Sequence, residues 1–330
     1  MGYQVPADIR RAIESERLAA PAGPASLVRT AVISGIYLAC ALVGLRWQHV
    51  LVWLPAWLVM AMILNGAISA SHEGVHGNLL RADWANKAVA EYWSLAVLLN
   101  FSLYRAYHLE HHRRTRLEGD PEPQTTFSNV LGYLVVFPIT GLYSLLQLWF
   151  TSAASLVGWF PAYVRTGRQR RNIRLDAVLV LAASGGAVAW GVVDTRSFLI
   201  AWAMPMLASS AVFTVTVLPE HYGCARVLDP LRSTRSTRSN ALVRYLYWNN
   251  NFHAEHHLIP GVPYLRVGRL SELLGDRVPN QARSYTRWHL GLIRELLSPD
   301  VIDLRDRPGL TEHPAATAAP PSERVTAGRG

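Results

Sequence analysis

Four long runs of apolar residues, nearly free of charged side chains, limit what this chain can fold into. They cover about residues 26–45, 49–71, 175–193 and 198–218. Each run is long enough to cross a hydrocarbon layer of about 30 Å as a helix that rises about 1.5 Å per residue. Only residues 46–48 separate the first two runs, and only residues 194–196 separate the last two. The sequence therefore predicts an all-α integral membrane fold with four transmembrane helices arranged as two hairpins.

The segments around these runs divide the chain further. Residues 1–25 carry acidic and basic side chains without an apolar stretch, which excludes a secretory signal peptide and predicts a cytoplasmic N-terminal segment. Residues 26–307 form the predicted membrane domain, and residues 308–330, rich in Ala, Pro, Thr and Gly, are expected to be a disordered tail. A further apolar stretch at 130–150 contains Pro138 and is compatible with a span, a re-entrant segment or a surface helix.

The charge of the chain points to a membrane surface. The formal net charge is +9, which suits either a nucleic acid or an anionic membrane. With membrane-length runs present, the membrane is favoured and nucleic-acid binding is not expected. Arginines concentrate between the two predicted hairpins and after the fourth run, whereas each hairpin tip carries one. The positive-inside rule therefore places both termini and the central connection in the cytoplasm, and the arginine-rich composition favours a bacterial inner membrane.

Nine of the 12 histidines fall in four places. His72 and His76 follow the second apolar run, and His221 follows the fourth. Two further groups lie in the predicted cytoplasmic regions, namely His108, His111 and His112, and His253, His256 and His257. Residues spaced at i, i+3 and i+4 share one face of a helix. Because all nine lie on the predicted cytoplasmic side, we expect short helical segments to bring them together.

Nine converging imidazoles indicate two metal ions. One transition-metal ion takes about four to six ligands, and neutral imidazole suits iron, zinc, copper and nickel. A single pair of histidines on a helix is more often polar surface, but three such clusters and a fourth site at a span end are not explained that way. The remaining histidines, which stand alone, are interpreted as structural or surface residues: His49, His289 and His313.

Three interpretations compete with this one, and the first two use fewer of these residues. His72-Glu73-x-x-His76 matches the zinc metalloprotease pattern, with Glu73 as general base, and would make the chain an intramembrane protease. That interpretation leaves seven histidines without a role. A carboxylate-bridged di-iron bundle needs Glu-x-x-His twice, and only Glu73-x-x-His76 fits. The non-enzymatic alternative is a membrane scaffold or transporter with a histidine-rich face that stores metal.

The three clusters His72-x-x-x-His76, His108-x-x-His111-His112 and His253-x-x-His256-His257 resemble the histidine boxes of the integral-membrane fatty acid desaturase and hydroxylase superfamily. The residues after the second box, Asp120-Pro121, and those after the third, 258–264, are also similar to that family, and the resemblance covers about residues 30–275. It implies that the nine histidines bind two iron ions in a helical cap on the cytoplasmic side. It also implies dioxygen as co-substrate and a lipid chain in an apolar tunnel beneath the irons.

The resemblance further implies that electrons come from a separate protein. Cys40 and Cys224 give no cysteine cluster, and no second soluble segment is recognisable, so we expect no ferredoxin or cytochrome domain in this chain. The arginine-rich cytoplasmic face would then dock an acidic ferredoxin or a similar donor.

One position departs from the family pattern. In some members an asparagine four residues before the isolated histidine contributes through water, and here that position, four before His221, is Val217. We expect Asn249, one of its neighbours at 250–251, or water to take this role. Carboxylates near the histidines are expected either to orient ligand rings through hydrogen bonds or to pair with arginines, with Asp120 favoured for the first role. These carboxylates are Glu73, Glu110, Asp120, Glu220 and Glu255.

The expected reaction is dioxygen-dependent oxidation of an unactivated C–H bond in a lipid acyl or alkyl chain, with desaturation favoured. Hydroxylation of an alkyl chain and ketolation or hydroxylation of a carotenoid by the same centre are alternatives. The stretch 220–223, Glu-His-Tyr-Gly, is similar to alkane hydroxylases, and the flank of the third box is similar to carotenoid ketolases. The outcome depends on substrate position at a scale below one carbon–carbon bond. The zinc protease is the more distant alternative.

Overall fold

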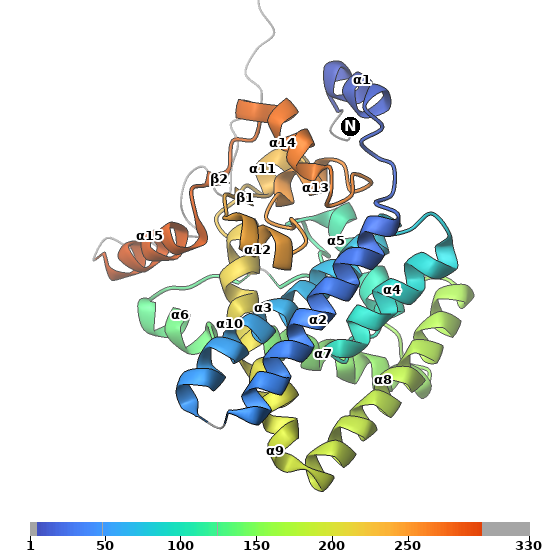
Figure 1. Ribbon diagram of the computed structural model, residues 1–330. Helices are drawn as coiled ribbons and strands as arrows, with labels where there is room; N and C mark the ends of the chain where they lie inside the picture. Colours follow the sequence, from blue (N-terminus) through green and yellow to red (C-terminus); the bar gives the residue numbers. More distant parts are fainter. Residues whose placement is uncertain (1–4, 48, 124, 299–330) are drawn as a thin grey trace, which may run out of the picture.

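The computed structural model describes residues 5–47, 49–123 and 125–298, so the predicted tail at 308–330 and His313 lie outside the described residues. The described chain is mostly helical (Figure 1), and four of its helical stretches are long and apolar enough to cross a membrane. This confirms the predicted all-α fold with four candidate spans. They are α2 (Pro24–Arg46), α3 (Val50–Val75), α8 (Gly167–Val193) and the stretch Thr195–His221.

Two of these helices extend well beyond the apolar runs. α8 begins eight residues earlier than predicted because Thr166 and Gln169 form a capping box at its N-terminus. α3 continues to Val75, so that His72 lies inside the helix. The fourth stretch is composite, with α9 (Thr195–Phe198), a π-helical turn η1 (Leu199–Ala203) and α10 (Met204–His221) in sequence. Pro205 follows the π-helical turn and lacks the N–H that a regular helix would need.

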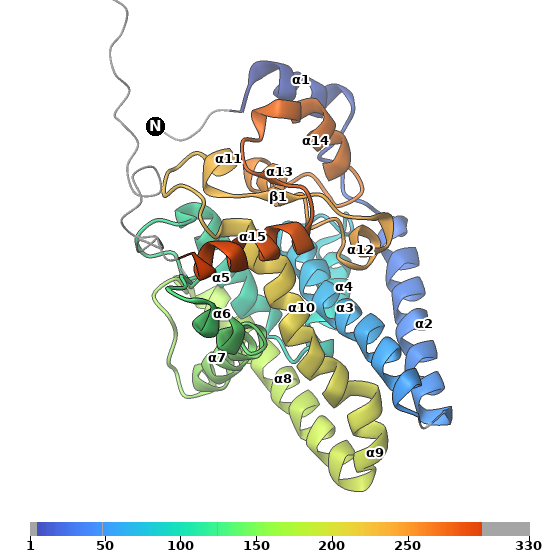
Figure 2. The same cartoon turned by 90° about the vertical axis from the view of Figure 1, so that its left-hand side faces the viewer.

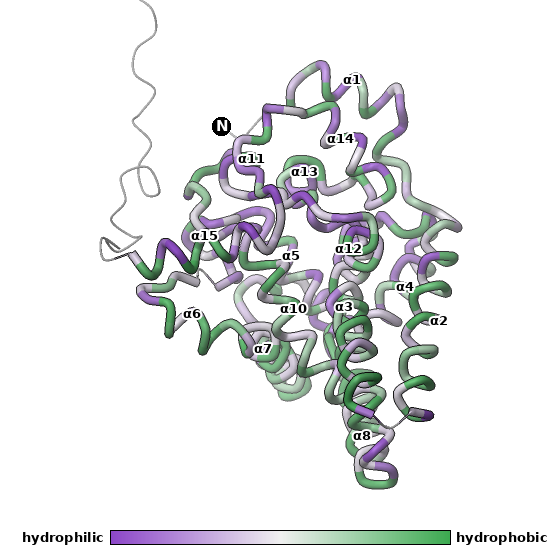
Figure 3. The backbone as a smooth tube through the Cα atoms, turned by 60° about the vertical axis from the view of Figure 1, so that its left-hand side comes forward, coloured by the Kyte–Doolittle hydropathy of each residue, from purple (hydrophilic) through white to green (hydrophobic). Residues whose placement is uncertain are grey.

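α3 occupies the centre of the helical layer. It packs against α2, α10 and the shorter helix α4 (Asp83–Ala96), and Ile63 and Ala67 are part of the buried core that results. α8 packs against α5 (Phe101–Arg114) and α7 (Thr140–Leu156). Large apolar side chains on the outer faces are more than half exposed, including Leu38, Leu54 and Leu207. Figure 3 shows hydrophobic stretches along α2 and α3, as expected for helices in contact with lipid.

The stretch at 130–150, for which the sequence leaves three possibilities, is a broken helix. α6 (Val130–Val136) and α7 are bent by 51° relative to each other. Pro138 lies in the break, where its missing N–H and its ring interrupt the helical hydrogen bonds. In Figure 2 the pair lies beside α10 on the side away from α2.

Short elements form an upper layer over one end of the spans (Figures 1 and 2). β1 and β2 pair in parallel, with Ser236 opposite Gln281. Buried residues from α1, α13 and α14, such as Ile9 and Leu270, give this layer its own core. Its elements are α1 (Ala7–Ser15), α11 (Pro230–Ser233), β1 (Ser236–Thr237), α12 (Ala241–Leu246), α13 (His253–Leu258), α14 (Val267–Leu274), a 3-10 turn η2 (Gly275–Arg277), β2 (Gln281–Ala282) and α15 (Tyr285–Leu297).

A buried arginine ties α2 to the upper layer. Arg29 Nε donates to the carbonyl oxygen of Tyr245 at 3.1 Å, and its Nη2 donates to that of Arg244 at 3.1 Å. Its guanidinium also lies over the rings of Tyr245 and Tyr264, at 4.4 and 4.5 Å from their centroids. Hydrogen bonds and cation–π contacts together satisfy a charge that burial would otherwise penalise. The segment that carries the third histidine box is thereby held against α2.

α3 packs against the end of α12 with the two backbones in direct contact. A Cβ atom placed on Gly66 would lie 2.0 Å from the carbonyl oxygen of Leu246, at the end of α12. The backbones approach this closely only because residue 66 has no side chain. A glycine on α2, Gly35, has no atom within 4 Å of its hypothetical Cβ and therefore carries no such constraint.

We expect Gly66→Ala to separate α3 from α12 and to destabilise the protein by about 1–3 kcal/mol or more, as overpacking of a tight contact does. Thermal unfolding in detergent measures the effect. Gly35→Ala is the matched control, because it adds the same methyl group to a helix facing open space and should change stability by about 1 kcal/mol at most. Equal unfolding temperatures for the two variants would contradict the close approach at Gly66.

Candidate metal centre

Four elements supply the nine histidines. α3 carries two of them at its C-terminal end, with His76 as its C-cap. α5, which begins where the Asn100 side chain accepts a hydrogen bond from the N–H of Leu103, carries three. His221 is the last residue of α10, and α13 carries the three of the third box. Each histidine thus projects from a regular helix or its cap.

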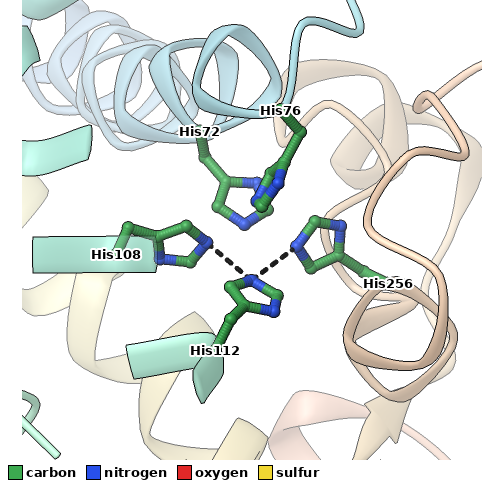
Figure 4. A group of neighbouring side chains, drawn as sticks. All are labelled: His72, His76, His108, His112 and His256. Atoms are coloured by element: carbon green, nitrogen blue, oxygen red, sulfur yellow. Dashed lines mark hydrogen bonds between the residues drawn. The ribbon is translucent and has the colours of Figure 1, made fainter. Parts of the chain in front are cut away.

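Five histidines from α3, α5 and α13 form one group, which we call the five-histidine cluster (Figure 4). One ring nitrogen from each lies within 4.8 Å of the others. His112 Nε2 is 2.8 Å from His108 Nε2 and 3.1 Å from His256 Nε2. Two facing ring nitrogens can share only one proton, whereas a metal ion accepts the lone pairs of all of them. The members are His72, His76, His108, His112 and His256.

The other four histidines form a second group, the four-histidine cluster, from α5, α10 and α13. His253 Nε2 lies 2.9 Å from His221 Nε2. The two clusters are neighbours, since the stacked rings of His112 and His257 have centroids 4.1 Å apart. The structure therefore brings all nine predicted residues together, but divides them unequally. The members of the second group are His111, His221, His253 and His257.

Several ring nitrogens are buried without a hydrogen-bond partner among the described residues. Such atoms cost free energy unless something else satisfies them. Neutral imidazole lone pairs that converge in this way fit transition-metal ions such as iron or zinc. The donor set is thus suited to one metal ion in each cluster. The atoms concerned are His72 Nδ1 and Nε2, His76 Nε2, His111 Nε2, His253 Nδ1 and His257 Nε2.

Burial keeps most of these rings in the neutral form that binds metal. It is the main reason why the pKa of His76 falls to about 3, with Arg105 contributing to the same effect. Burial, together with the neighbouring imidazoles, also holds the pKa of five further rings well below the usual range for histidine. These are His108, His112, His253, His256 and His257.

His111 differs because two carboxylates flank its ring. Its Nδ1 is 2.9 Å from Asp120 Oδ1, and its Nε2 is 2.9 Å from Glu122 Oε2. Burial disfavours the charged ring, but the two carboxylates outweigh burial and raise the pKa of His111 to about 10. In turn, although burial opposes it, His111 holds the pKa of Glu122 at about 2. Asp120 also accepts a hydrogen bond from the N–H of Arg116 at 2.7 Å, which fixes the orientation of its carboxylate.

Glu220 supports the four-histidine cluster from the side of α10. Its Oε1 accepts hydrogen bonds from the hydroxyl of Tyr247 and from Nδ2 of Asn250, both at 3.1 Å. Its Oε2 lies 3.5 Å from His253 Nδ1. A carboxylate in this position can orient the ring of a metal-binding histidine.

Two other carboxylates have different surroundings. Glu255 accepts hydrogen bonds from the hydroxyls of Ser236 and Ser271, which tie α13 to β1 and α14. Glu110 takes the second of the two roles expected for these carboxylates, because it pairs with nearby arginines and not with a histidine ring. Its partners are Arg113, Arg114 and Arg165.

Glu73 and Asn249 both contact the backbone of Tyr264. Glu73 Oε2 accepts the N–H of Tyr264 at 2.9 Å, and Asn249 Nδ2 donates to its carbonyl oxygen at 2.7 Å. Both contacts therefore hold the chain that follows the third box close to α3.

Two of the isolated histidines lie away from the clusters. His49 caps the N-terminus of α3, where its Nδ1 accepts the N–H of Leu51 at 3.2 Å. His289 is buried and joins three elements, with Nδ1 2.8 Å from the hydroxyl of Tyr133 and Nε2 donating to the carbonyl oxygen of Val215 at 2.9 Å.

A cavity of about 100 Å³ reaches both clusters. Its wall includes His72 from the five-histidine cluster and His253 from the four-histidine cluster. α7 and α10 contribute apolar side chains, among them Leu145, Phe213 and Val217. Val217, four residues before His221, thus faces this cavity. A substrate carbon placed here would lie next to both groups of ring nitrogens.

Sequence reasoning missed one residue at this site, Glu122, which lines the cavity. Of the three asparagines at 249–251 that the sequence offers, Asn250 lines the cavity, whereas Asn249 donates to the carbonyl oxygen of Tyr264. Glu122 follows the recognised Asp120-Pro121 pair directly. That proximity is the one signal that could have identified it.

The chain is similar to known proteins over the part that contains the site. The family model described as "Fatty acid desaturase" matches residues 48–289, a range that includes all nine clustered histidines. The sn-1 oleoyl-lipid 12-desaturase of a Picosynechococcus species is 26% identical over 261 residues, which cover 72% of each chain.

We expect Asp120→Asn to weaken metal binding by about 10–100-fold, because the carboxylate that orients His111 is lost. Titration of the purified, metal-free protein with ferrous iron measures the change. Glu110→Gln is the matched control, since it also neutralises a buried carboxylate but one whose partners are arginines. This control should lower the unfolding temperature and leave metal affinity as it is. Equal losses of affinity in the two variants would contradict the role assigned to Asp120.

Proposed function

The chain belongs to the fatty acid desaturase family, and from this premise we propose that it introduces a double bond into an acyl chain of a membrane lipid. Dioxygen is the co-substrate, and two iron ions form the centre. The observation that carries the proposal is the pair of adjacent clusters in which all nine histidines of the boxes and of the α10 terminus converge. The similarity to a protein named as an oleoyl-lipid desaturase supports desaturation of a lipid-bound chain.

The two clusters, the neighbouring carboxylates and the cavity would each have a separate role. The five-histidine cluster would hold one iron and the four-histidine cluster the other. Bound iron would supply activation of dioxygen and removal of hydrogen from an unactivated C–H bond. Asp120 and Glu220 would keep His111 and His253 oriented. The cavity against both clusters would position the acyl chain and limit the access of water.

We place the four spans in the membrane as two hairpins, α2 with α3 and α8 with α10. The upper layer and the histidine clusters then form a cap on the cytoplasmic side. The support is the arginine distribution, which is dense in the connection between the hairpins and sparse at their tips. The same composition favours a bacterial inner membrane.

A separate protein would deliver the electrons. Arg113 and Arg165, whose side chains are 55% and 51% exposed, lie on and beside the helix that carries the second box. A basic surface close to the metal centre favours an acidic donor such as a ferredoxin.

Two observations weigh against the zinc protease. His72 and His76 share their cluster with three other histidines, which a single zinc site would not require. Glu73, the residue that would act as general base, accepts a hydrogen bond from the backbone N–H of Tyr264. Hydroxylation and ketolation would use the same metal centre, so the products must separate them from desaturation.

We expect cells that express the wild-type chain under oxygen to accumulate lipids that have lost two hydrogen atoms from an acyl chain. His253→Ala should abolish the new product and lower iron content, because it removes a ligand candidate from the four-histidine cluster. Lipid mass spectrometry and metal analysis of the purified protein provide the two measurements. His49→Ala is the matched control, since it removes a histidine remote from both clusters.

The products separate the alternatives. A product that has gained one oxygen atom, and has not lost two hydrogen atoms, would identify the reaction as hydroxylation and not as desaturation. Retention of full metal content and activity in His253→Ala would contradict the di-iron centre and favour a protease that uses only His72 and His76.

We expect turnover with an acidic ferredoxin to fall several-fold when salt is raised from about 0.05 M to about 0.5 M, because screening weakens attraction between separated surface charges. Steady-state kinetics with the ferredoxin, and with a small uncharged reductant as control, provide the comparison. The control reaction should change little. An equal response in both reactions would argue against docking on the basic surface.

A further inference from the structure

The unequal division of the histidines leaves one cluster a ligand short of the other. The five-histidine cluster has five imidazoles and the four-histidine cluster has four. Val217, which lines the cavity beside this cluster, has no donor atom. We propose that the carboxylate of Glu122 is the fifth ligand of the metal ion in the four-histidine cluster. This inference rests on the proposed function, since it assumes a metal ion in each cluster.

The position of the carboxylate matches that of a ligand. Glu122 Oε2 lies 2.9 Å from His111 Nε2 and 3.8 Å from His221 Nε2, and both histidines belong to the four-histidine cluster. Donor atoms that bind one ion at about 2.0–2.1 Å would lie about 3–4 Å from one another. Glu122 therefore lies at ligand-to-ligand distance from two members of the cluster at once.

Glu122 and His111 are in direct contact, with the carboxylate oxygen 2.9 Å from Nε2 of the ring. A ring proton satisfies this contact in the absence of a metal ion, and a metal ion bound by both atoms would replace that proton. Nδ1 of the same ring is already occupied by Asp120 at 2.9 Å.

The local chain holds Glu122 in this position. Its backbone N–H donates to Asp120 Oδ1 at 3.0 Å, so the residue that orients His111 also fixes the turn that presents Glu122. Pro121 and Pro123 flank it and restrict its backbone. The side chain lines the cavity that reaches both clusters.

A carboxylate ligand would make the two sites chemically different. Five neutral imidazoles bring no charge to their ion, whereas four imidazoles and a carboxylate bring one negative charge. An anionic oxygen ligand stabilises ferric over ferrous iron relative to a neutral nitrogen ligand. The iron in the four-histidine cluster would therefore have the lower reduction potential of the two.

The test uses the full chain, purified in detergent and loaded with ⁵⁷Fe(II) without oxygen. Glu122→Gln removes the charge at nearly constant volume, and Glu122→His replaces the carboxylate by another ligand. Glu118→Gln, an exposed position in the same loop, is the matched control. Iron affinity and stoichiometry come from titration, and Mössbauer spectra report the environment of each iron separately. Thermal unfolding establishes that each variant is folded.

We expect Glu122→Gln to weaken binding of the second iron by about tenfold or more and to shift only one of the two Mössbauer signals. Glu122→His should restore two irons per chain with an altered signal, and Glu118→Gln should match the wild type. Two irons with wild-type affinity and unshifted spectra in Glu122→Gln would overturn the inference. If the wild type and Glu118→Gln both failed to bind a second iron, the proposed function itself would be overturned.

Discussion

Nine closely packed imidazoles, six of them buried, set the main physical demand on this protein. Within the clusters, pairs of Nε2 atoms approach to 2.8–3.1 Å, and lone pairs this close repel unless a proton or a cation lies between them. Burial lowers the pKa of most of these rings, so protons are a poor solution. The surrounding helices must hold the rings in place against that repulsion, and a metal ion bound between the rings would replace it with attraction.

The surrounding helices hold the rings in place through close backbone packing and through buried polar groups that are hydrogen-bonded. Gly66 lets α3 touch the end of α12, and Gly74, where a Cβ would lie 2.3 Å from that of Ala90, lets α3 touch α4. Arg29 joins α2 to the segment before the third box through two backbone carbonyls. Packing at backbone distance leaves little freedom to move. The ends of α3, α5 and α13 are therefore fixed relative to one another by contacts outside the metal centre.

Local features of the sequence predicted the spans and the convergence of the histidines, because apolar length and helical spacing are visible along the chain. Contacts between elements that are distant in the sequence could not be predicted from it. The five-to-four division depends on how α5 and α13 face each other, and nothing in the spacing of His108, His111 and His112 assigns His111 to the other cluster. Likewise, Glu110 pairs with Arg113 and Arg114 at local helical spacing, but its third partner, Arg165, is 55 residues away. Glu122 differs, since it lay next to a recognised motif and was overlooked.

The sharing of α5 and α13 between the two clusters has a thermodynamic consequence. α5 gives His108 and His112 to one cluster and His111 to the other, and α13 is divided in the same way. An ion bound in either cluster would fix imidazole rings on both α5 and α13, so a second ion would meet helices whose remaining motion is already reduced. Uptake of two ions would then show positive cooperativity, and chains with none or two would outnumber chains with one. By the same linkage, release of either ion would weaken the retention of the other.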